Sequence, residues 1–245
     1  MATYLRCQSC EFIFVEDPFW LHASFGGTLQ HVDVGSVDRN LLAAQVLKTA
    51  ITTLNIKDGV FVDWGGGYGL LSRIMRDSGF NYHNQESFVT PLFYSPEVPP
   101  GTEKYSLISV IEVILHYTQP LEEFRALLEK TDRLFFTTTI SPSKIDSNWW
   151  YLMPDTGQHV ALYTKKSLEI LAHILGVKFV SDEKFFHMFY RGSIPTFTKL
   201  IFRSRIMCFA YAQFLSLRQL YKRSRGGTVS LIDNDHKFTL AKEME

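Results

Sequence analysis

A glycine-rich turn is the part of the chain whose residue types and spacing are best suited to chemistry. Asp63 stands two residues before Gly65, which is followed by Gly66, Gly67 and Gly69. Glycine lets a backbone turn tightly and approach a ligand closely because no Cβ stands in the way. An apolar run that predicts a strand precedes the turn, and a segment with helical spacing follows it. We therefore predict a strand–turn–helix unit that presents its backbone to a ligand.

The spacing of these glycines separates two classes of cofactor. A dinucleotide-binding turn has the pattern Gly-x-Gly-x-x-Gly, and counted from Gly65 its third glycine would fall at Leu70. The pattern here, Asp-x-Gly-x-Gly-x-Gly, resembles the first motif of class I methyltransferases. That resemblance implies a turn packed on the amino-acid and ribose portions of S-adenosylmethionine, with Asp63 near the ammonium group. A nicotinamide-dependent oxidoreductase is the weaker alternative, and an ordinary glycine turn after a strand is the purely structural one.

Two further acids are candidates for the same site. Glu86 follows the predicted strand Asn81–Gln85, roughly 20 residues beyond the turn, where an acid can hold ribose hydroxyls. Its alternative is an ordinary surface glutamate. Glu112 comes just after the predicted strand 105–111 and could shape the pocket around the methyl group, or instead cap a helix or bond to backbone. The predicted cofactor-binding residues are Asp63, Gly65, Gly67, Gly69, Glu86 and Glu112.

Several segments resemble one methyltransferase family, the group called methyltransferase domain 23, which is often found with sugar and surface-polysaccharide genes. The similarity is first evident in residues 63–93, and it extends over residues 58–180. Residues 111–116 resemble the family's Glu-Val-x-Glu-His segment. Residues 149–151 and 157–163 resemble its Trp-Trp-Tyr and Gly-Gln-His-x-x-x-Tyr segments. The resemblance implies S-adenosylmethionine as cofactor and methyl transfer as the reaction, and a sugar or polysaccharide acceptor rests on it alone.

The chain also departs from this family. Leu115 stands where the family has a second acid, and a third strand is hard to find between residues 88 and 104. Cys7 and Cys10 resemble half of a zinc ribbon, but the one further cysteine is the distant Cys208. A closed zinc site needs four ligands, so we expect no bound metal. These losses leave open a non-catalytic module that binds the cofactor without turnover.

Two histidines are candidates for the catalytic base. His116 and His159 both follow predicted strands and are expected at the rim where an open α/β sheet binds ligands. Histidine titrates near neutral pH, so either could accept a proton, and either could instead bond a loop carbonyl. We favour His159 because it follows an aromatic cluster, Trp149, Trp150 and Tyr151. These rings are predicted to hold the acceptor, with a lid packed on the core as the alternative.

The elements that must position these residues alternate between strands and helices. Such alternation predicts an α/β Rossmann-like fold with a mostly parallel sheet, and the last two strands predict a terminal antiparallel hairpin. The expected helices are 38–55, capped by Asp38, and 70–78, 120–130 and 165–175, and the expected strands are 59–63, 81–85, 105–111, 133–139, 177–180 and 185–190. We divide the chain into an N-terminal extension (1–37), a methyltransferase domain (38–192) and a basic helical extension (193–245).

The composition of the chain limits which partners, such as nucleic acid or a membrane, it is expected to bind. Lys and Arg balance Asp and Glu at 25 each, which gives no bulk electrostatic reason to bind nucleic acid. No early apolar run resembles a signal peptide, and the longest apolar stretch, 206–215, is too short to span a bilayer. We therefore expect a soluble cytoplasmic protein. Residues 197–225 read as a basic amphipathic segment, which more often docks on its own domain or a second copy than on an anionic membrane.

Overall fold

A six-stranded sheet forms the centre of the computed structural model, which describes residues 2–25, 33–56, 58–225 and 230–243. The strand order is β4-β3-β5-β6-β9-β8. The first four strands are parallel, and β9 is antiparallel to both β6 and β8. The strands are β3 (Phe61–Trp64), β4 (Tyr82–Gln85), β5 (Leu107–Val110), β6 (Arg133–Thr137), β8 (Lys178–Ser181) and β9 (Phe186–Tyr190). The predicted fold class, including the terminal hairpin, is confirmed.

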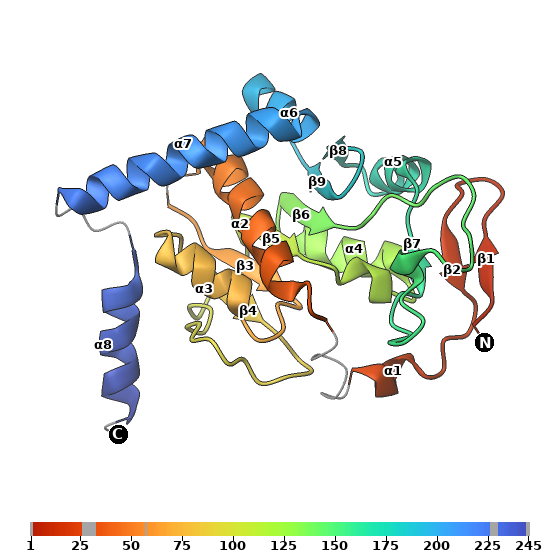
Figure 1. Ribbon diagram of the computed structural model, residues 1–245, viewed down its shortest axis with the longest axis horizontal. Coiled ribbons are helices and arrows are strands. Elements are labelled where there is room, and N and C mark those ends of the chain that lie inside the picture. Colours follow the sequence, from red (N-terminus) through yellow and green to blue (C-terminus); the bar gives the residue numbers. More distant parts are fainter. Residues whose placement is uncertain (1, 26–32, 57, 226–229, 244–245) are drawn as a thin grey trace.

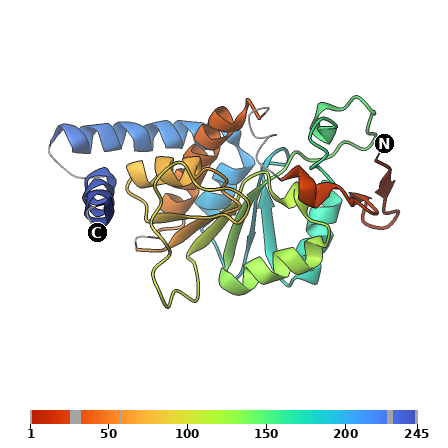
Figure 2. The same cartoon turned by 90° about the horizontal axis from the view of Figure 1, so that it is seen from below.

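Helices cover both faces of this sheet (Figures 1 and 2). Successive strand residues point to opposite faces, so Phe135 packs with one core cluster and Phe136 with the other. The Phe135 side is covered by α2 (Ser36–Thr53), α3 (Leu70–Asp77), α6 (Thr196–Arg203) and α7 (Arg205–Ser224). The Phe136 side is covered by α4 (Pro120–Lys130) and α5 (Lys165–Ile174). Because both faces are buried, the central strands β5 and β6 are mostly apolar, whereas the edge strand β4 is polar apart from Tyr82.

Most predicted boundaries hold to within two residues, with one correction at α2. The predicted cap Asp38 lies in the first turn of α2, and the helix is preceded by Gly35 without a side-chain cap. A carboxylate in the first turn still interacts favourably with the N-terminal end of the helix dipole. Helix α5 does have a side-chain cap, because Thr164 and Ser167 form a reciprocal capping box. None of the helices in the described ranges is long and apolar enough to cross a membrane.

The N-terminal extension begins with a β-hairpin. Strands β1 (Tyr4–Arg6) and β2 (Ile13–Val15) pair with each other, and β2 also pairs with β7 (Ala161–Leu162). A short helix, α1 (Leu21–Ser24), follows. The N-terminal extension therefore packs on the domain in a second, three-stranded sheet beside the rim. The three domain boundaries stay a prediction.

Strand β4 is the edge of the central sheet, and residues 87–104 contain no strand. A loop covers that edge instead. The backbone N–H of Asn84 donates to Ser95 Oγ at 2.8 Å, and His83 Nδ1 lies 2.9 Å from the carbonyl oxygen of Pro96. Side-chain bonds of this kind shield an exposed strand edge from pairing with another chain.

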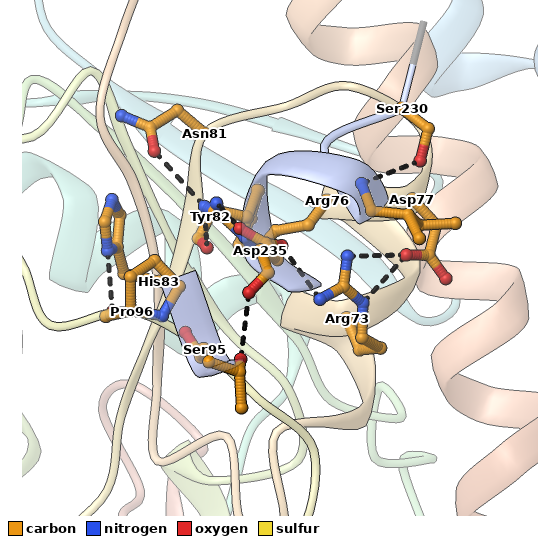
Figure 3. Close-up of polar contacts among 12 residues, drawn as sticks. Arg73, Arg76, Asp77, Asn81, Tyr82, His83, Ser95, Pro96, Ser230 and Asp235 are labelled. Atoms are coloured by element: carbon orange, nitrogen blue, oxygen red, sulfur yellow. Dashed lines mark hydrogen bonds and ion pairs between the residues drawn. The ribbon is translucent and has the colours of Figure 1, made fainter. Parts of the chain in front are cut away.

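A buried ion pair holds the last helix, α8 (Ile232–Glu243), against α3 (Figure 3). Arg76 donates from Nε and Nη2 to the two carboxylate oxygens of Asp235 at 2.8 and 2.5 Å, and Arg73 donates to the same carboxylate at 2.9 Å. Arg76 also donates to the carbonyl oxygen of Tyr82 on β4 at 3.2 Å. A bidentate pair fixes orientation as well as distance, so one side chain connects α8, α3 and the sheet.

We expect Asp235→Asn to release α8 and to lower the free energy of unfolding at neutral pH by about 3 kcal/mol, because a buried arginine loses its partner. Burial would raise the pKa of Asp235, but the hydrogen bonds and charges of Arg76 and Arg73 outweigh it and hold that pKa below its usual value. The folded-state pKa is depressed, so the stabilisation exists above the unfolded-state pKa and is lost as pH falls through the folded one.

Urea unfolding at neutral and acidic pH measures this effect, and amide exchange of α8 locates it. Asp233→Asn is the matched control, since Asp233 lies in the same first turn but is exposed. Equal stability of the two variants at neutral pH would show that the ion pair does not hold the helix.

Candidate active site

The predicted glycine turn lies where β3, β4 and β5 end at the same edge of the sheet. Gly65, Gly67 and Gly69 have positive φ angles of 71°, 54° and 82°. A Cβ on Gly65 would meet the Val113 side chain at 2.8 Å, whereas a Cβ on Gly67 would meet nothing within 4 Å. Gly65 is therefore needed for packing against the next strand's loop. Gly67 is the glycine that faces open space, as a surface for a ligand requires.

Gly66 is required for a reason that the motif did not indicate. A Cβ there would lie 2.1 Å from Asn84 Oδ1 and 2.5 Å from Asp63 Oδ2. Asn84 in turn donates from Nδ2 to the carbonyl oxygen of Gly67 at 3.0 Å. Sequence reasoning missed Asn84, since an asparagine inside a predicted strand carries no signal of this contact.

Glu86 lies beside the turn, as predicted. Its Oε2 accepts the backbone N–H of Gly67 at 2.8 Å, and its Oε1 accepts those of Ser87 and Phe88 at 2.7 Å each. These bonds fix the carboxylate next to the open glycine. A carboxylate oxygen can accept more than one hydrogen bond, so Glu86 keeps acceptor capacity for hydroxyl groups of a ligand.

Asp63 lies behind the turn and not on its open side. The residue is 1% exposed, and its Oδ1 accepts the hydroxyl of Ser109 at 2.7 Å. Burial raises the pKa of the Asp63 carboxyl to about 7, Ser109 opposes the shift, and the charge of Glu86 adds to it. This placement leaves little of the Asp63 carboxylate open to a ligand, and its contact with an ammonium group stays a prediction.

We expect Asp63→Asn to remove a pH dependence of stability. The folded-state pKa, about 7, lies above the ordinary value of 3.8, so ionisation penalises the folded state increasingly as pH rises between these values. Between pH 5 and pH 8 the unfolding free energy of the parent protein should fall by about 2.6 kcal/mol, and that of the variant should not. Urea unfolding at both pH values measures it, with Ser109→Ala as the control that leaves the acid in place. Parallel curves for the parent and Asp63→Asn would contradict the assignment.

Glu112 joins three elements at the rim. Its backbone is left-handed, with φ 55°, and its N–H donates to Thr137 Oγ1 at 2.9 Å. Its carboxylate accepts the hydroxyls of Thr137 and Tyr151, each at 2.9 Å. Burial raises the pKa of Glu112, and the nearby charge of Arg39 opposes that shift. A left-handed non-glycine residue held by such contacts is typical of functional sites.

The aromatic cluster does not act as one surface. Tyr151 is only 1% exposed and packs with Leu115 and Leu162, while its hydroxyl donates to Glu112 and accepts the N–H of Thr139 at 2.8 Å. The prediction that Tyr151 offers a face to the acceptor is therefore corrected, since the ring is part of the core. Trp149 is half-buried, and Trp150 is 66% exposed with its ring centroid 5.1 Å from that of Tyr151. Only Trp150 offers an open face.

The two candidate histidines lie together at the rim, with ring centroids 5.9 Å apart. Burial lowers the pKa of His116 to about 3, and it lowers that of His159 to about 4 against an opposing bond to Tyr151. His159 Nδ1 lies 2.6 Å from the carbonyl oxygen of Tyr151. A carbonyl oxygen only accepts, so Nδ1 carries the proton and Nε2 holds a free lone pair. The geometry gives His159 the tautomer that a general base needs.

The N-terminal extension positions this histidine loop, which the sequence did not indicate. The Tyr4 hydroxyl donates to the carbonyl oxygen of His159 at 2.7 Å, and Trp20 Nε1 donates to that of Gly157 at 2.9 Å. The Phe25 ring lies 5.3 Å from the ring of His116 and 4.8 Å from that of Phe88. The extension thus connects the histidines to the loop that follows Glu86.

The cysteine pair lies in the turn of the N-terminal hairpin, where the N–H of Cys7 donates to the carbonyl oxygen of Phe12 at 2.8 Å. Within the described ranges, no three His, Cys, Asp or Glu side chains gather closely enough to hold a metal ion. Leu115, which replaces the family acid, is fully buried with Ile13 and Leu162. It joins the N-terminal sheet to the rim.

Comparison with known proteins agrees with the sequence resemblance. The methyltransferase domain 23 family model, described as a methyltransferase domain, matches residues 37–181. Among solved structures, magnesium protoporphyrin IX methyltransferase from Synechocystis PCC 6803 is 14% identical, with 71% of this chain and 91% of that chain covered and a TM-score of 0.44. A SAM-dependent methyltransferase from Thermotoga maritima is 12% identical, with 70% of this chain and 99% of that chain covered and a TM-score of 0.48. No curated protein sequence matches the chain.

Proposed function

The chain belongs to the methyltransferase domain 23 family and uses S-adenosylmethionine as its cofactor, and we propose that it methylates a small-molecule acceptor, specifically a sugar or polysaccharide unit. The observation that carries the proposal of methyl transfer is the turn at Gly67. It faces open space, its N–H is held by Glu86 at 2.8 Å, and it lies at the edge of the sheet where ligands of open α/β folds bind.

The residues at this turn fit the cofactor. A Cβ at Gly67 would take up open space beside the backbone, so the position suits close approach of a ligand. Glu86 is fixed beside it by three backbone N–H groups and can accept ribose hydroxyls. When bound, S-adenosylmethionine supplies a methyl group activated by its positive sulfonium. The protein then needs to orient the acceptor, exclude water and remove a proton.

His159 is the residue we assign to proton removal. Its Nδ1–H donates to the Tyr151 carbonyl oxygen, which leaves Nε2 free to accept a proton from an acceptor hydroxyl. The low pKa of His159, about 4, keeps Nε2 unprotonated throughout the physiological range, and it also makes this ring a weaker base than an ordinary histidine. His116 lies beside it, with its ring centroid 5.3 Å from that of Phe25, and burial lowers its pKa to about 3. We assign it to packing against Phe25.

The acceptor class is supported by the rim residues and by the sequence resemblance. Trp150 offers an exposed aromatic face near the histidines, and such faces stack on sugar rings. The neutral total charge of the chain gives no general attraction to nucleic acid. Trp150 is therefore the residue we assign to holding the acceptor, and Trp149 packs beside it on the same Tyr151 ring.

Methyl transfer from labelled S-adenosylmethionine tests the proposal. The purified protein is incubated with methyl-labelled cofactor and either a panel of sugars and nucleotide sugars or a lysate separated by size. We expect label in a carbohydrate fraction, with none for a Gly67→Val control. Label found in RNA or protein would contradict the acceptor class, and binding of the cofactor without transfer to any fraction would contradict the activity.

A further inference from the structure

Helix α7 carries an apolar stripe on the side that faces away from the domain. Its inward residues Cys208, Ala212 and Leu215 are buried over α2. The opposite side shows large apolar side chains that are between 56% and 84% exposed, namely Ile206, Phe214, Leu217, Leu220 and Tyr221. These positions recur at helical spacing, so they form one stripe along the helix. Figures 1 and 2 show α7 along the outer margin of the molecule.

The stripe continues onto helix α6. The ring of Tyr211 lies 5.5 Å from that of Phe197 on α6 and 5.9 Å from that of Phe214 on α7. Phe197 and Leu200 are themselves exposed. The outer face of the two helices is therefore a contiguous apolar patch of a kind that marks an interaction site.

The segment that carries the patch is strongly basic although the whole chain is neutral. Residues 184–232 contain nine of the chain's 25 Lys and Arg and none of its 25 Asp and Glu. The remainder of the chain therefore has a matching excess of acids. Positive charge gathers in the same segment as the exposed apolar residues.

Basic side chains flank the stripe on α7. Arg218 and Lys222 are exposed and line a groove between α7 and Lys48 of α2, on the flank of α7 between the stripe and the buried Leu215. Burial lowers the pKa of Lys48. On the other flank Arg205 donates to Asp182 at 2.7 Å and is therefore already paired within the chain.

We propose that this outer face of α6 and α7 binds the surface of an anionic membrane. An interfacial helix buries an apolar stripe at the boundary between headgroups and acyl chains while flanking Lys and Arg contact lipid phosphates. A second copy of the chain would bring two basic segments against each other, and like charges at an interface repel. A nucleic acid would need the basic residues at the centre of the face, where the side chains here are apolar. Membrane docking would hold the enzyme at a surface and goes beyond the proposed methyl transfer.

Vesicle co-sedimentation tests this proposal with three proteins. The parent is mixed with phosphatidylcholine vesicles, with and without phosphatidylglycerol, and we expect binding to the anionic vesicles that weakens as salt rises. Arg218→Gln with Lys222→Gln should weaken binding about 25-fold, at about fivefold for each charge removed. Phe214→Gln with Leu217→Gln should weaken it by about tenfold or more. Glutamine is a good helix former, and circular dichroism checks that the helix persists.

Matched controls separate this face from general surface effects. Ile174→Gln removes an equally exposed apolar side chain from α5, and Lys130→Gln with Lys144→Gln removes two exposed charges elsewhere. Both controls should bind vesicles like the parent. The proposal is overturned if the parent does not bind anionic vesicles, or if the control variants weaken binding as much as the α7 variants do. It is also overturned if the parent is a dimer that Leu217→Gln dissociates and that does not bind vesicles, or if this face binds RNA and not lipid.

Discussion

Replacing Gly67 by valine should lower the affinity for S-adenosylmethionine by about 100-fold or more, equivalent to about 3 kcal/mol, while the domain stays folded. The reason is geometric, because a Cβ at this position meets no protein atom within 4 Å and so enters the space that the turn leaves for a ligand. The backbone φ of 54° adds strain for a β-branched residue, so a modest loss of thermal stability is also expected. Isothermal titration with the cofactor and thermal unfolding measure the two effects separately.

Gly176→Val is the matched control for that strain. Gly176 has φ 66°, a Cβ there also meets nothing within 4 Å, and the residue follows α5, away from the turn. It should lose similar stability and bind the cofactor normally. Gly66→Ala should behave differently from both, because its Cβ would lie 2.1 Å from Asn84 Oδ1 and would disrupt the turn itself. If Gly67→Val is folded and binds as tightly as the parent, the turn has only a structural role.

Replacing His159 by alanine should lower turnover by about 10²–10⁴-fold, the range expected for loss of a general base, with nearly unchanged cofactor affinity. His116→Ala should cost much less, since that ring packs against Phe25. His159→Asn separates catalysis from positioning. Its amide can still donate to the Tyr151 carbonyl oxygen, but it has no equivalent of Nε2. If His159 is the base, the turnover of His159→Asn should stay as low as that of His159→Ala. If His159 is only a structural donor, asparagine should restore turnover.

The pH profile gives an independent check of this base. A protonated imidazole cannot accept a proton, so turnover at saturating cofactor should fall as pH falls through the pKa of His159, about 4, and should be level from pH 5 to pH 8. An acid limb near the ordinary histidine pKa would contradict the burial of this ring. A loss below tenfold in His159→Ala, together with a larger loss in His116→Ala, would reverse the assignment.

The sequence by itself determined the alternation of strands and helices, the glycine turn and the nearness of Glu86 to it. These features follow from local patterns. Apolar residues repeat with the period of a strand or a helix, and glycines mark where the backbone must turn. The carboxyl ends of parallel strands meet at one edge, so the rim position of His116 and His159 also follows from strand order. The family resemblance added the cofactor, which a local pattern alone does not identify.

Only the tertiary structure decided how these residues divide their roles. The motif does not distinguish Gly67, which faces open space, from Gly66, which is confined by Asn84 and Asp63. Asp235 meets Arg76 from 159 residues away, and Tyr4 meets His159 from 155 residues away. Contacts at such separations depend on how whole elements pack, and no periodicity along the chain encodes them. For the same reason the burial of Asp63 and Tyr151, and with it their pKa values and their distance from a ligand, is a property of the folded protein and not of the motif.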